Sequence, residues 1–398
     1  MGSLTKLKIA YIAKDFWPSI PAGLIAVEIA TRLARHGHVV ELLVPNIASC
    51  GLAAKQPLIV LRGLTVHYLG PRLSKLPANT ISCSFLLFKG ISAALRADII
   101  LSQHHHASLV SFFSAIISIV TRRPLVVRAE DVVPGNPERL LDKLLCFAIG
   151  SCNSWAIKRA KLFLVSSKEL AECSQRMYAV GKATVGVSHN GVDTKKFSLK
   201  NLSREMRRRF DSEHIVIFSG TLYAMRGLEI LLRAAAILKP KIPDLKVLIM
   251  GVGPDYSRLL SMAKSLGLGQ SVLFLGGVDP DLVPTYLASA DIAIGPLRAS
   301  VQTYGTNPVK VLEYMASGCV VIATKNTASA EILIDGLNGI LIESDPVDLA
   351  ASILRVFSDP YLVARLRVRA RETVEKCYDW EKVVSELLLS LDSALTTR

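Results

Sequence analysis

The sequence predicts an α/β protein built from two doubly wound domains, and a repeated pattern of apolar segments leads to that prediction. Short, nearly continuous apolar runs alternate with amphipathic segments along all 398 residues. Strands that are apolar throughout are typical of parallel sheets covered by helices on both faces. The chain is long enough for two domains, and 51% hydrophobic residues supply two cores. Two such domains in series leave a cleft between them, and open α/β sheets bind ligands at the carboxyl ends of their strands.

The first domain is expected to open with a strand over residues 8–13 and a loop that ends at Gly23. An amphipathic helix over residues 24–36 follows, and Gly37 can end it in the left-handed conformation. The remaining apolar runs predict strands at residues 39–44, 98–101, 125–127 and 162–165, and then at 215–219, 246–250, 272–275, 291–294, 320–323 and 339–342.

A turn signal at Asn190-Gly191, followed by a polar, arginine-rich stretch, marks a domain boundary. We place the first domain at residues 1–195 and the second at residues 196–377. Residues 378–398 contain a last helix.

Charge is distributed unevenly between the two halves of the chain. Residues 1–195 hold 23 Lys and Arg against 11 Asp and Glu, a net charge of +12, and the remainder holds 24 against 22, a net of +2, which together give +14. A basic half indicates an anionic partner for that half. Nucleic acid is not expected, because the basic residues are dispersed and no nucleic-acid-binding motif occurs. An anionic membrane surface fits better, and general basicity that serves solubility is the alternative.

Residues 140–161 mix large apolar side chains with lysines and arginines, so this helix could lie on a membrane interface or could be a core helix with basic ends. No apolar run reaches the roughly 18–20 residues that a membrane span needs, and the N-terminus does not resemble a signal peptide. The seven cysteines are scattered without a Cys-x-x-Cys pattern, which favours reduced thiols. We therefore expect a cytoplasmic protein that is peripheral at the inner face of the membrane.

Residues 306–324 read as a loop, a short helix and a buried strand. Asn307 suits the N-cap of this helix, Pro308 suits its first position and Gly318 suits its end. Such a helix points its free N–H groups and the positive end of its dipole at whatever lies in front of Asn307. The segment therefore predicts a site for an anion such as a diphosphate.

Glu313 lies further along the same helix, within reach of a hydroxyl-bearing group attached to that phosphate. A surface glutamate that pairs with Lys310, three residues earlier, is the other interpretation. The sequence pattern leaves both interpretations open.

This segment resembles the donor site of GT-B glycosyltransferases of family 4. The family signature is a Glu, seven residues, a second Glu and then Ala-Met-Ala-x-Gly-x-Pro-Val-Val-Ala. Glu313 matches the second Glu, whereas the first would fall at Gly305. In register with the signature follow Met315, Ala316, Gly318, Val320, Val321, Ala323 and Thr324.

The resemblance covers essentially the whole chain and implies a GT-B fold. In that fold two Rossmann-like domains face each other across a cleft, and the C-terminal helix returns to the first domain. It further implies a retaining enzyme that uses a nucleoside-diphosphate sugar as co-substrate, with no cofactor and no metal. The donor-binding residues that it implies are Gly23, Gly220, Thr221, Arg226, Gly277, Val278, Thr306, Asn307, Val309, Lys310 and Glu313.

The loop from Ser219 to Gly227 resembles the family's Gly-Arg-x-x-x-x-Lys-Gly element, in which the two cations bind the donor diphosphate. This chain has Thr221 at the arginine position and Arg226 at the lysine position. Arginine binds phosphate oxygens in a bidentate manner, and Lys310 offers a second cation. Positive charge there would stabilise the leaving diphosphate, so Arg226 is a predicted catalytic residue. A solvated loop arginine is the alternative.

Glu130 stands where family members commonly place a histidine beside the reacting sugar, and Asp131 follows it. A carboxylate at this position could accept a proton from a sugar or acceptor hydroxyl, and Arg128 could hold it ionised. Glu130 is therefore the second predicted catalytic residue, and the alternative is a substitution that weakens or abolishes activity.

Three adjacent histidines, His104, His105 and His106, follow the predicted strand at residues 98–101. Adjacent histidines on one turn cannot all face one ion, so a metal site is not expected. Their place at a strand's carboxyl end favours recognition of an acceptor phosphate or lipid. With Arg128 and Asp131 they form the predicted acceptor side.

The sequence thus predicts a glycosyltransferase that moves a sugar from a nucleoside-diphosphate sugar to a glycan or a lipid-linked acceptor. One alternative is a GT-B sugar-nucleotide epimerase. The other is a non-catalytic nucleotide-sugar-binding subunit, because Gly305, Thr221 and Glu130 all depart from the family pattern.

Overall fold

The computed structural model divides the chain into two compact units. The first contains Met1–His189 and Trp380–Arg398, and the second contains Asn190–Asp379. The division between them falls between His189 and Asn190, close to the boundary predicted after residue 195. Within these units the structure describes residues 6–14, 21–47, 61–73, 85–106, 108–130, 140–181, 184–295, 297–298, 309–325 and 328–396.

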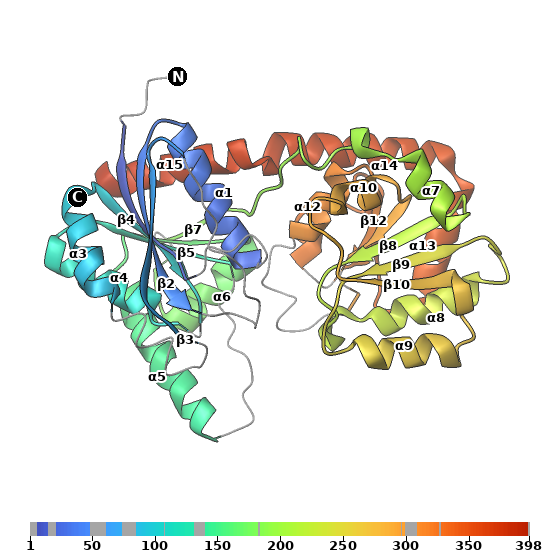
Figure 1. Ribbon diagram of the computed structural model, residues 1–398, viewed down its shortest axis with the longest axis horizontal. Helices are drawn as coiled ribbons and strands as arrows, with labels where there is room; N and C mark the ends of the chain where they lie inside the picture. The colour runs from blue at the N-terminus through green and yellow to red at the C-terminus, as the bar shows by residue number, and fades with distance from the viewer. Residues whose placement is uncertain are drawn as a thin grey trace. The chain divides into compact units, whose positions relative to one another are not determined.

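The first unit is a parallel seven-stranded sheet with the strand order β3-β2-β1-β4-β5-β6-β7 (Figure 1). The order reverses between β1 and β4, which is where open α/β sheets bind their ligands. Two of these strands were not predicted: β3 carries polar residues along its length, and β7 has only three residues. The strands are β1 (Lys8–Ile12), β2 (Val39–Ile47), β3 (Leu64–Leu73), β4 (Ile99–His104), β5 (Leu125–Ala129), β6 (Leu162–Val165) and β7 (Val185–Val187).

Helices pack on the first sheet, and one core joins apolar side chains of its strands, among them Ile12, Ile100 and Val127, to side chains of the helices. They are α1 (Pro21–Arg35), α3 (Leu86–Arg96), α4 (Val110–Thr121), α5 (Leu140–Ile157), α6 (Lys168–Tyr178) and α15 (Trp380–Thr396). No helix in the described ranges of the chain combines the length and the apolar character that crossing a bilayer requires.

The last helix, α15, packs on α1 within the first unit. Glu381 at its start lies 3.2 Å from Arg32 Nε and 2.9 Å from His36 Nε2. The Arg32 guanidinium also lies 6.0 Å from the ring centre of Trp380. The C-terminus of the chain is therefore part of the first unit.

The second unit is a parallel six-stranded sheet with the order β10-β9-β8-β11-β12-β13, which reverses between β8 and β11. Its strands are β8 (Ile215–Ser219), β9 (Lys246–Met250), β10 (Val272–Gly276), β11 (Ile292–Ile294), β12 (Val320–Thr324) and β13 (Ile340–Ile342). Its helices are α7 (Arg204–Phe210), η3 (Ala224–Arg226), α8 (Leu228–Leu238), α9 (Tyr256–Ser265), α10 (Val283–Ala288), α12 (Val309–Ala316), α13 (Pro346–Ser358) and α14 (Pro360–Thr373). The parallel α/β fold of both units is confirmed.

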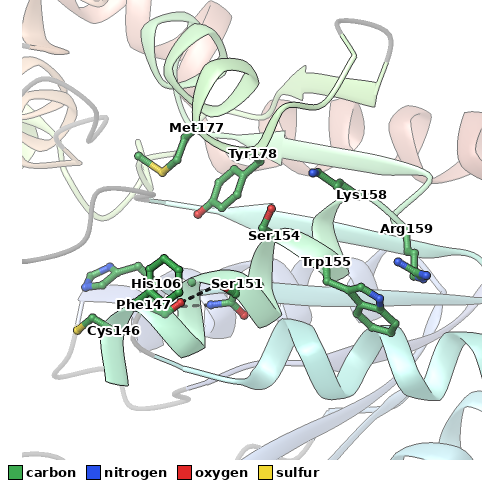
Figure 2. A pocket seen from close by; sticks show the side chains of 12 residues that line it. His106, Cys146, Phe147, Ser151, Ser154, Trp155, Lys158, Arg159, Met177 and Tyr178 are labelled. Atoms are coloured by element: carbon green, nitrogen blue, oxygen red, sulfur yellow. Dashed lines mark hydrogen bonds between the residues drawn. The ribbon is translucent and has the colours of Figure 1, made fainter. Parts of the chain in front are cut away.

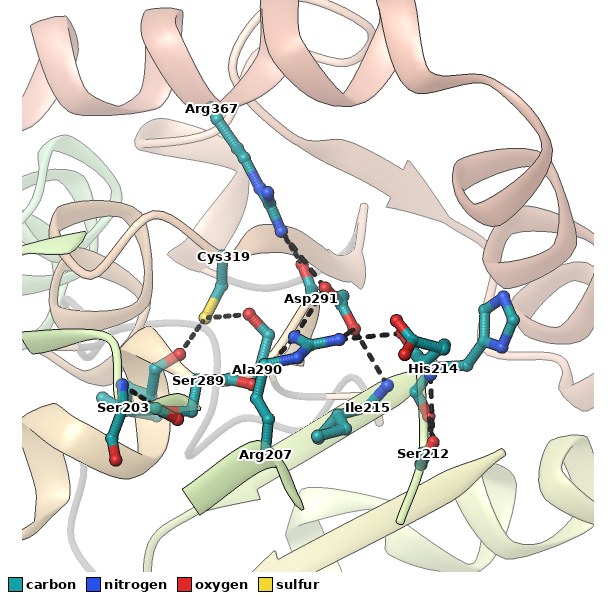
Figure 3. Close-up of polar contacts among 12 residues, drawn as sticks. Ser203, Arg207, Ser212, His214, Ile215, Ser289, Ala290, Asp291, Cys319 and Arg367 are labelled. Atoms are coloured by element: carbon teal, nitrogen blue, oxygen red, sulfur yellow. Dashed lines mark hydrogen bonds and ion pairs between the residues drawn. The ribbon is translucent and has the colours of Figure 1, made fainter. Parts of the chain in front are cut away.

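A polar network around Asp291 fixes the start of β11 in the second unit (Figure 3). The Asp291 carboxylate accepts hydrogen bonds from Arg207 at 3.0 and 3.2 Å and from the backbone N–H of Ile215 at 3.0 Å. Arg367 on α14 lies 3.6 Å from the same carboxylate. One aspartate therefore joins α7, β8, β11 and α14 at the amino end of the sheet, opposite the strand ends that carry the candidate site.

Candidate active site

Glycines pack the carboxyl ends of β8, β9 and β10 against one another. Gly220 and Gly251 have φ angles of 143° and 137°, a region that favours glycine, and a Cβ on Gly251 would overlap the carbonyl oxygen of Gly220. The N–H of Gly251 donates to Gly276 O at 2.7 Å. Gly277, which follows β10, is exposed, and the next residue, Val278, is half-buried. This edge therefore presents backbone groups rather than side chains to a ligand.

Lys310, in the first turn of α12, extends over this glycine edge. Its Nζ lies 4.7 Å from the ring centre of Phe218 on β8, and a Cβ on Gly220 would overlap the same Nζ. The pKa of Lys310 is lowered to about 7, mainly by burial and in part by the positive charge of Arg226, while Glu313 acts in the opposite direction. Gly220 thus leaves the space that the Lys310 amine occupies.

Arg226 ends the short η3 helix, and Gly227 closes that turn with a φ of 70°. The carbonyl of Arg226 accepts from the N–H of Leu297 at 3.1 Å, which holds the loop in place. Its Nε is buried, and in the described part of the chain it has neither a hydrogen-bond partner nor a carboxylate within ion-pair distance. Burial lowers the pKa of this guanidinium. Arg226 is therefore a partly desolvated cation available to an anion and not a solvated loop residue.

Glu313 lies one turn after Lys310, but the described residues include no ion pair between the two, so the interpretation as a surface pair is wrong. Burial raises the pKa of Glu313 to about 7, while Lys310 and Lys196 lower it. Its neighbour Tyr314 donates a hydrogen bond to Ser219 O at 2.9 Å and accepts one from Ser219 N at 2.8 Å. Tyr314 thereby fixes α12 to the end of β8, where Arg226 and Glu313 both act electrostatically on Lys310.

The structure places the five other predicted donor-side residues differently. Thr306 and Asn307 lie outside the described residues, and Val309 is the first residue of α12 in the structure. Thr221 is exposed beside Gly220. Gly23 lies in the first turn of α1, so its predicted place in a loop is wrong: the helix begins at Pro21, which suits a first helical position.

In the first unit, Arg128 and Glu130 form a pair at the end of β5. The Arg128 side chain is 2% exposed and donates to Glu130 Oε1 at 2.8 Å, to Ser188 O at 3.3 Å and to His189 O at 3.2 Å. Gln103 Nε2 donates to both Glu130 oxygens, at 3.1 and 3.3 Å. The carboxylate is therefore oriented from two sides. Asp131 lies outside the described residues.

The three histidines do not act together. His104, the last residue of β4, is 1% exposed, with Nδ1 3.0 Å from Ser111 Oγ and Nε2 3.3 Å from Tyr178 OH. It is a core residue, so its predicted acceptor-side role is wrong. His105 and His106 are half-buried and stacked, with ring centres 4.4 Å apart. No group of three His, Cys, Asp or Glu side chains in the described ranges could hold a metal ion.

Comparison with known proteins identifies the family of the chain. Residues 22–196 match the family described as Glycosyltransferase Family 4, and residues 200–373 match Glycosyl transferases group 1. The chain is a family 4 glycosyltransferase.

An uncharacterised glycosyltransferase of Methanocaldococcus jannaschii is 25% identical to this glycosyltransferase over 410 residues, which cover 96% of both chains. A GDP-mannose-dependent α-(1-6)-phosphatidylinositol monomannoside mannosyltransferase of Mycolicibacterium smegmatis is 29% identical over 197 residues, 48% of this chain and 51% of the relative. The match thus spans about half the length of that relative.

The crystal structure of Anabaena Alr3699/HepE in complex with UDP superposes with a TM-score of 0.73 at 20% identity and covers 97% of this chain and all of the other. This likeness confirms the GT-B fold of the enzyme.

Several residues that position the site could not be recognised from the sequence pattern. Phe218 and Tyr314 read only as apolar positions of a strand and a helix, and nothing in the pattern shows that they hold Lys310 and the end of β8. Gln103 could have been found, because it lies near the carboxyl end of β4, the strand that pairs with β5, and Glu130 directly follows β5.

Proposed function

We propose that this glycosyltransferase binds a nucleoside-diphosphate sugar in its second unit and transfers the sugar with retention and without a metal. The observation that supports the proposal is the set of two desolvated cations and one carboxylate, Arg226, Lys310 and Glu313, at the glycine edge of the sheet. Among relatives, one is named as GDP-mannose-dependent and one was crystallised with UDP, so the base and the sugar are left open.

The diphosphate would be bound by Arg226 and Lys310, with Thr306, Asn307, Val309 and Thr221 around it. Both cations lie in a partly desolvated place, where a charge acts more strongly on a leaving phosphate than it does in water. Glu313 would accept hydrogen bonds from the ribose hydroxyls. Gly23, Gly220, Gly277 and Val278 would contact the donor through backbone groups.

On the acceptor side, Glu130 would contact the reacting sugar or the acceptor hydroxyl. Arg128 and Gln103 fix its position, so it could receive a proton at a defined place. Arg128, Asp131, His105 and His106 would surround the acceptor. Retention is the stereochemical outcome that the family resemblance implies.

The acceptor would be a glycan or a lipid-linked sugar that the enzyme meets at the cytoplasmic face of a membrane. The net charge of +12 on residues 1–195, from 23 basic and 11 acidic residues, supports association with an anionic surface. The mannosyltransferase relative is named for a phosphatidylinositol acceptor, which agrees with this proposal.

A nucleotide-sugar-binding subunit without activity is the second candidate, because Gly305, Thr221 and Glu130 depart from the family pattern. An epimerase is a third. Incubation with a panel of labelled nucleoside-diphosphate sugars separates the three: sugar release or transfer that persists in a chelator supports the proposal, and NMR of the product reports retention. Binding without turnover, or conversion of one nucleotide sugar into another, would contradict it.

A further inference from the structure

A groove of about 510 Å³ lies beside α5 in the first unit (Figure 2). Residues from Cys146 to Trp155 on α5, with Lys158 and Arg159 just after the helix, line it over roughly 20 Å at 1.5 Å per residue. Met177 and Tyr178 at the end of α6 form the opposite wall, and His106 lies at one end. Glu130, the residue proposed to act on the acceptor, does not line this groove.

Gly150 lies in the middle of α5 and lines the groove. Glycine inside a helix is less favourable than alanine, so a local reason for it is expected. At Gly90 on α3 the reason is packing, because a Cβ would come within 2.5 Å of Ile117. At Gly150 a Cβ would meet no atom within 4 Å. The missing side chain at Gly150 therefore serves no contact within the described protein and leaves the groove open.

Asn153 provides a second, independent observation. It is 1% exposed and lines the same groove. Its Nδ2 donates to Ser108 O at 3.1 Å and to His106 O at 3.4 Å, which ties α5 to the loop after β4. Its Oδ1 is buried and has no hydrogen-bond partner among the described residues. The groove wall thus offers a hydrogen-bond acceptor to a hydroxyl.

Apolar and basic side chains gather along the groove and beside it. Phe147 is 76% exposed and Leu144 is 59% exposed on the same helix. At the other end Lys158 and Arg159 are exposed, and the Arg159 guanidinium lies 4.0 Å from the ring centre of Trp155. Exposed aromatic and aliphatic side chains combined with cations are typical of helices at a membrane interface.

We propose that this groove binds one anionic phospholipid of the membrane surface. One acyl chain would lie along Phe147, Gly150 and Trp155, the phosphate would face Lys158 and Arg159, and a head-group hydroxyl would donate to Asn153 Oδ1. The inference rests on the proposed membrane association and adds to it a specific lipid site outside the reaction centre.

The test uses the full chain and vesicles of phosphatidylglycerol with brominated acyl chains, which quench tryptophan fluorescence. We expect quenching that is lost in Trp155→Phe and in Gly150→Leu, whose side chain fills the groove. Gly150→Ala, which adds one methyl group, is the matched control and keeps the quenching. Phe88→Ser removes another exposed aromatic side chain of the same unit and leaves the quenching unchanged.

Lys158→Gln/Arg159→Gln should bind these vesicles about 30-fold more weakly, which corresponds to about 2 kcal/mol for two basic residues near an anionic surface. Because this double variant leaves the helix interior intact, it tests the site even if Gly150→Leu unfolds. Equal quenching by phosphatidylcholine would overturn the anionic specificity. If Gly150→Leu is quenched as strongly as the wild type, or if vesicles bind without quenching Trp155, the groove is not the lipid site.

Transfer of labelled sugar and donor affinity are measured in parallel. A protein that shows the quenching but no sugar transfer contradicts the proposed enzyme activity and not the lipid site. A protein that transfers sugar but shows no quenching contradicts only the lipid site. Self-association that Gly150→Leu abolishes would assign the groove to a second copy of the chain and overturn the lipid proposal.

Discussion

Replacing Lys310 by methionine is expected to stabilise the unliganded protein and to weaken donor binding. Burial lowers the Lys310 pKa from 10.5 to about 7. In free energy this change corresponds to about 5 kcal/mol at most. The accessible surface of the Lys310 side chain shows that it is only half-buried, so solvent screens its charge. We therefore expect Lys310→Met to raise the free energy of unfolding by about 2 kcal/mol. Methionine keeps an apolar contact with the Phe218 ring.

The gain should depend on pH in a defined direction. Below pH 7 the lysine is charged in both the folded and the unfolded states, so the whole cost of burying the charge is present. Between pH 7 and 10.5 the folded protein binds fewer protons than the unfolded chain, so wild-type stability at this site rises with pH. The advantage of Lys310→Met is therefore constant below pH 7 and shrinks above it.

Denaturant unfolding of wild type and Lys310→Met at several pH values between 6 and 10 measures this difference. Lys325→Met is the matched control, because Lys325 is an exposed lysine of the same unit in a surface pair with Glu343. The free energy of unfolding of Lys325→Met should equal that of the wild type. Titration calorimetry should show donor binding weakened by about 1.5–3 kcal/mol in Lys310→Met, the usual range for a hydrogen bond to a charged group. Lower stability than wild type at pH 6, or a pH-independent difference, would refute the reasoning.

Glu313→Gln should weaken nucleotide binding by about 1–3 kcal/mol in calorimetry, and unchanged affinity would exclude the ribose role. Arg226→Ala should lower turnover at saturating donor more than it weakens donor binding, because the guanidinium acts mainly as the diphosphate leaves; steady-state kinetics showing the reverse would contradict this. Arg128→Met removes the cation that pairs with the Glu130 carboxylate and should lower the free energy of unfolding by about 3–5 kcal/mol in denaturant experiments; wild-type stability would show that the pair is dispensable. Co-sedimentation with anionic vesicles should fade as salt rises, and salt-independent binding would exclude an electrostatic origin.

The sheets could be predicted because most strands are buried on both faces and so are apolar throughout. Strand β3 lies at the edge of its sheet and mixes polar with apolar residues, and β7 is too short to form a pattern. Those two strands depend on pairing with a neighbour, which a local sequence pattern does not contain.

The resemblance to the family's Gly-Arg-x-x-x-x-Lys-Gly element placed Arg226 between Gly220 and Gly227, and its donor-binding role stays a prediction. The contact of Lys310 with Phe218 could not be predicted, because the two residues are far apart in the chain and meet only when α12 packs on β8. His104 was misassigned for a similar reason. A histidine beside two others reads as exposed, whereas the core around Tyr178 binds both of its ring nitrogens.

The return of α15 to the first unit has a consequence for synthesis on the ribosome. The second unit is one continuous segment, Asn190–Asp379, whereas the first needs the last residues of the chain. At about 5–20 residues per second, roughly 10–40 s pass between the end of the first segment and the appearance of α15. During that time α15 is absent, so the surface of α1 on which it packs is exposed to solvent. The second unit can therefore finish folding before the first, in the reverse of their order along the chain.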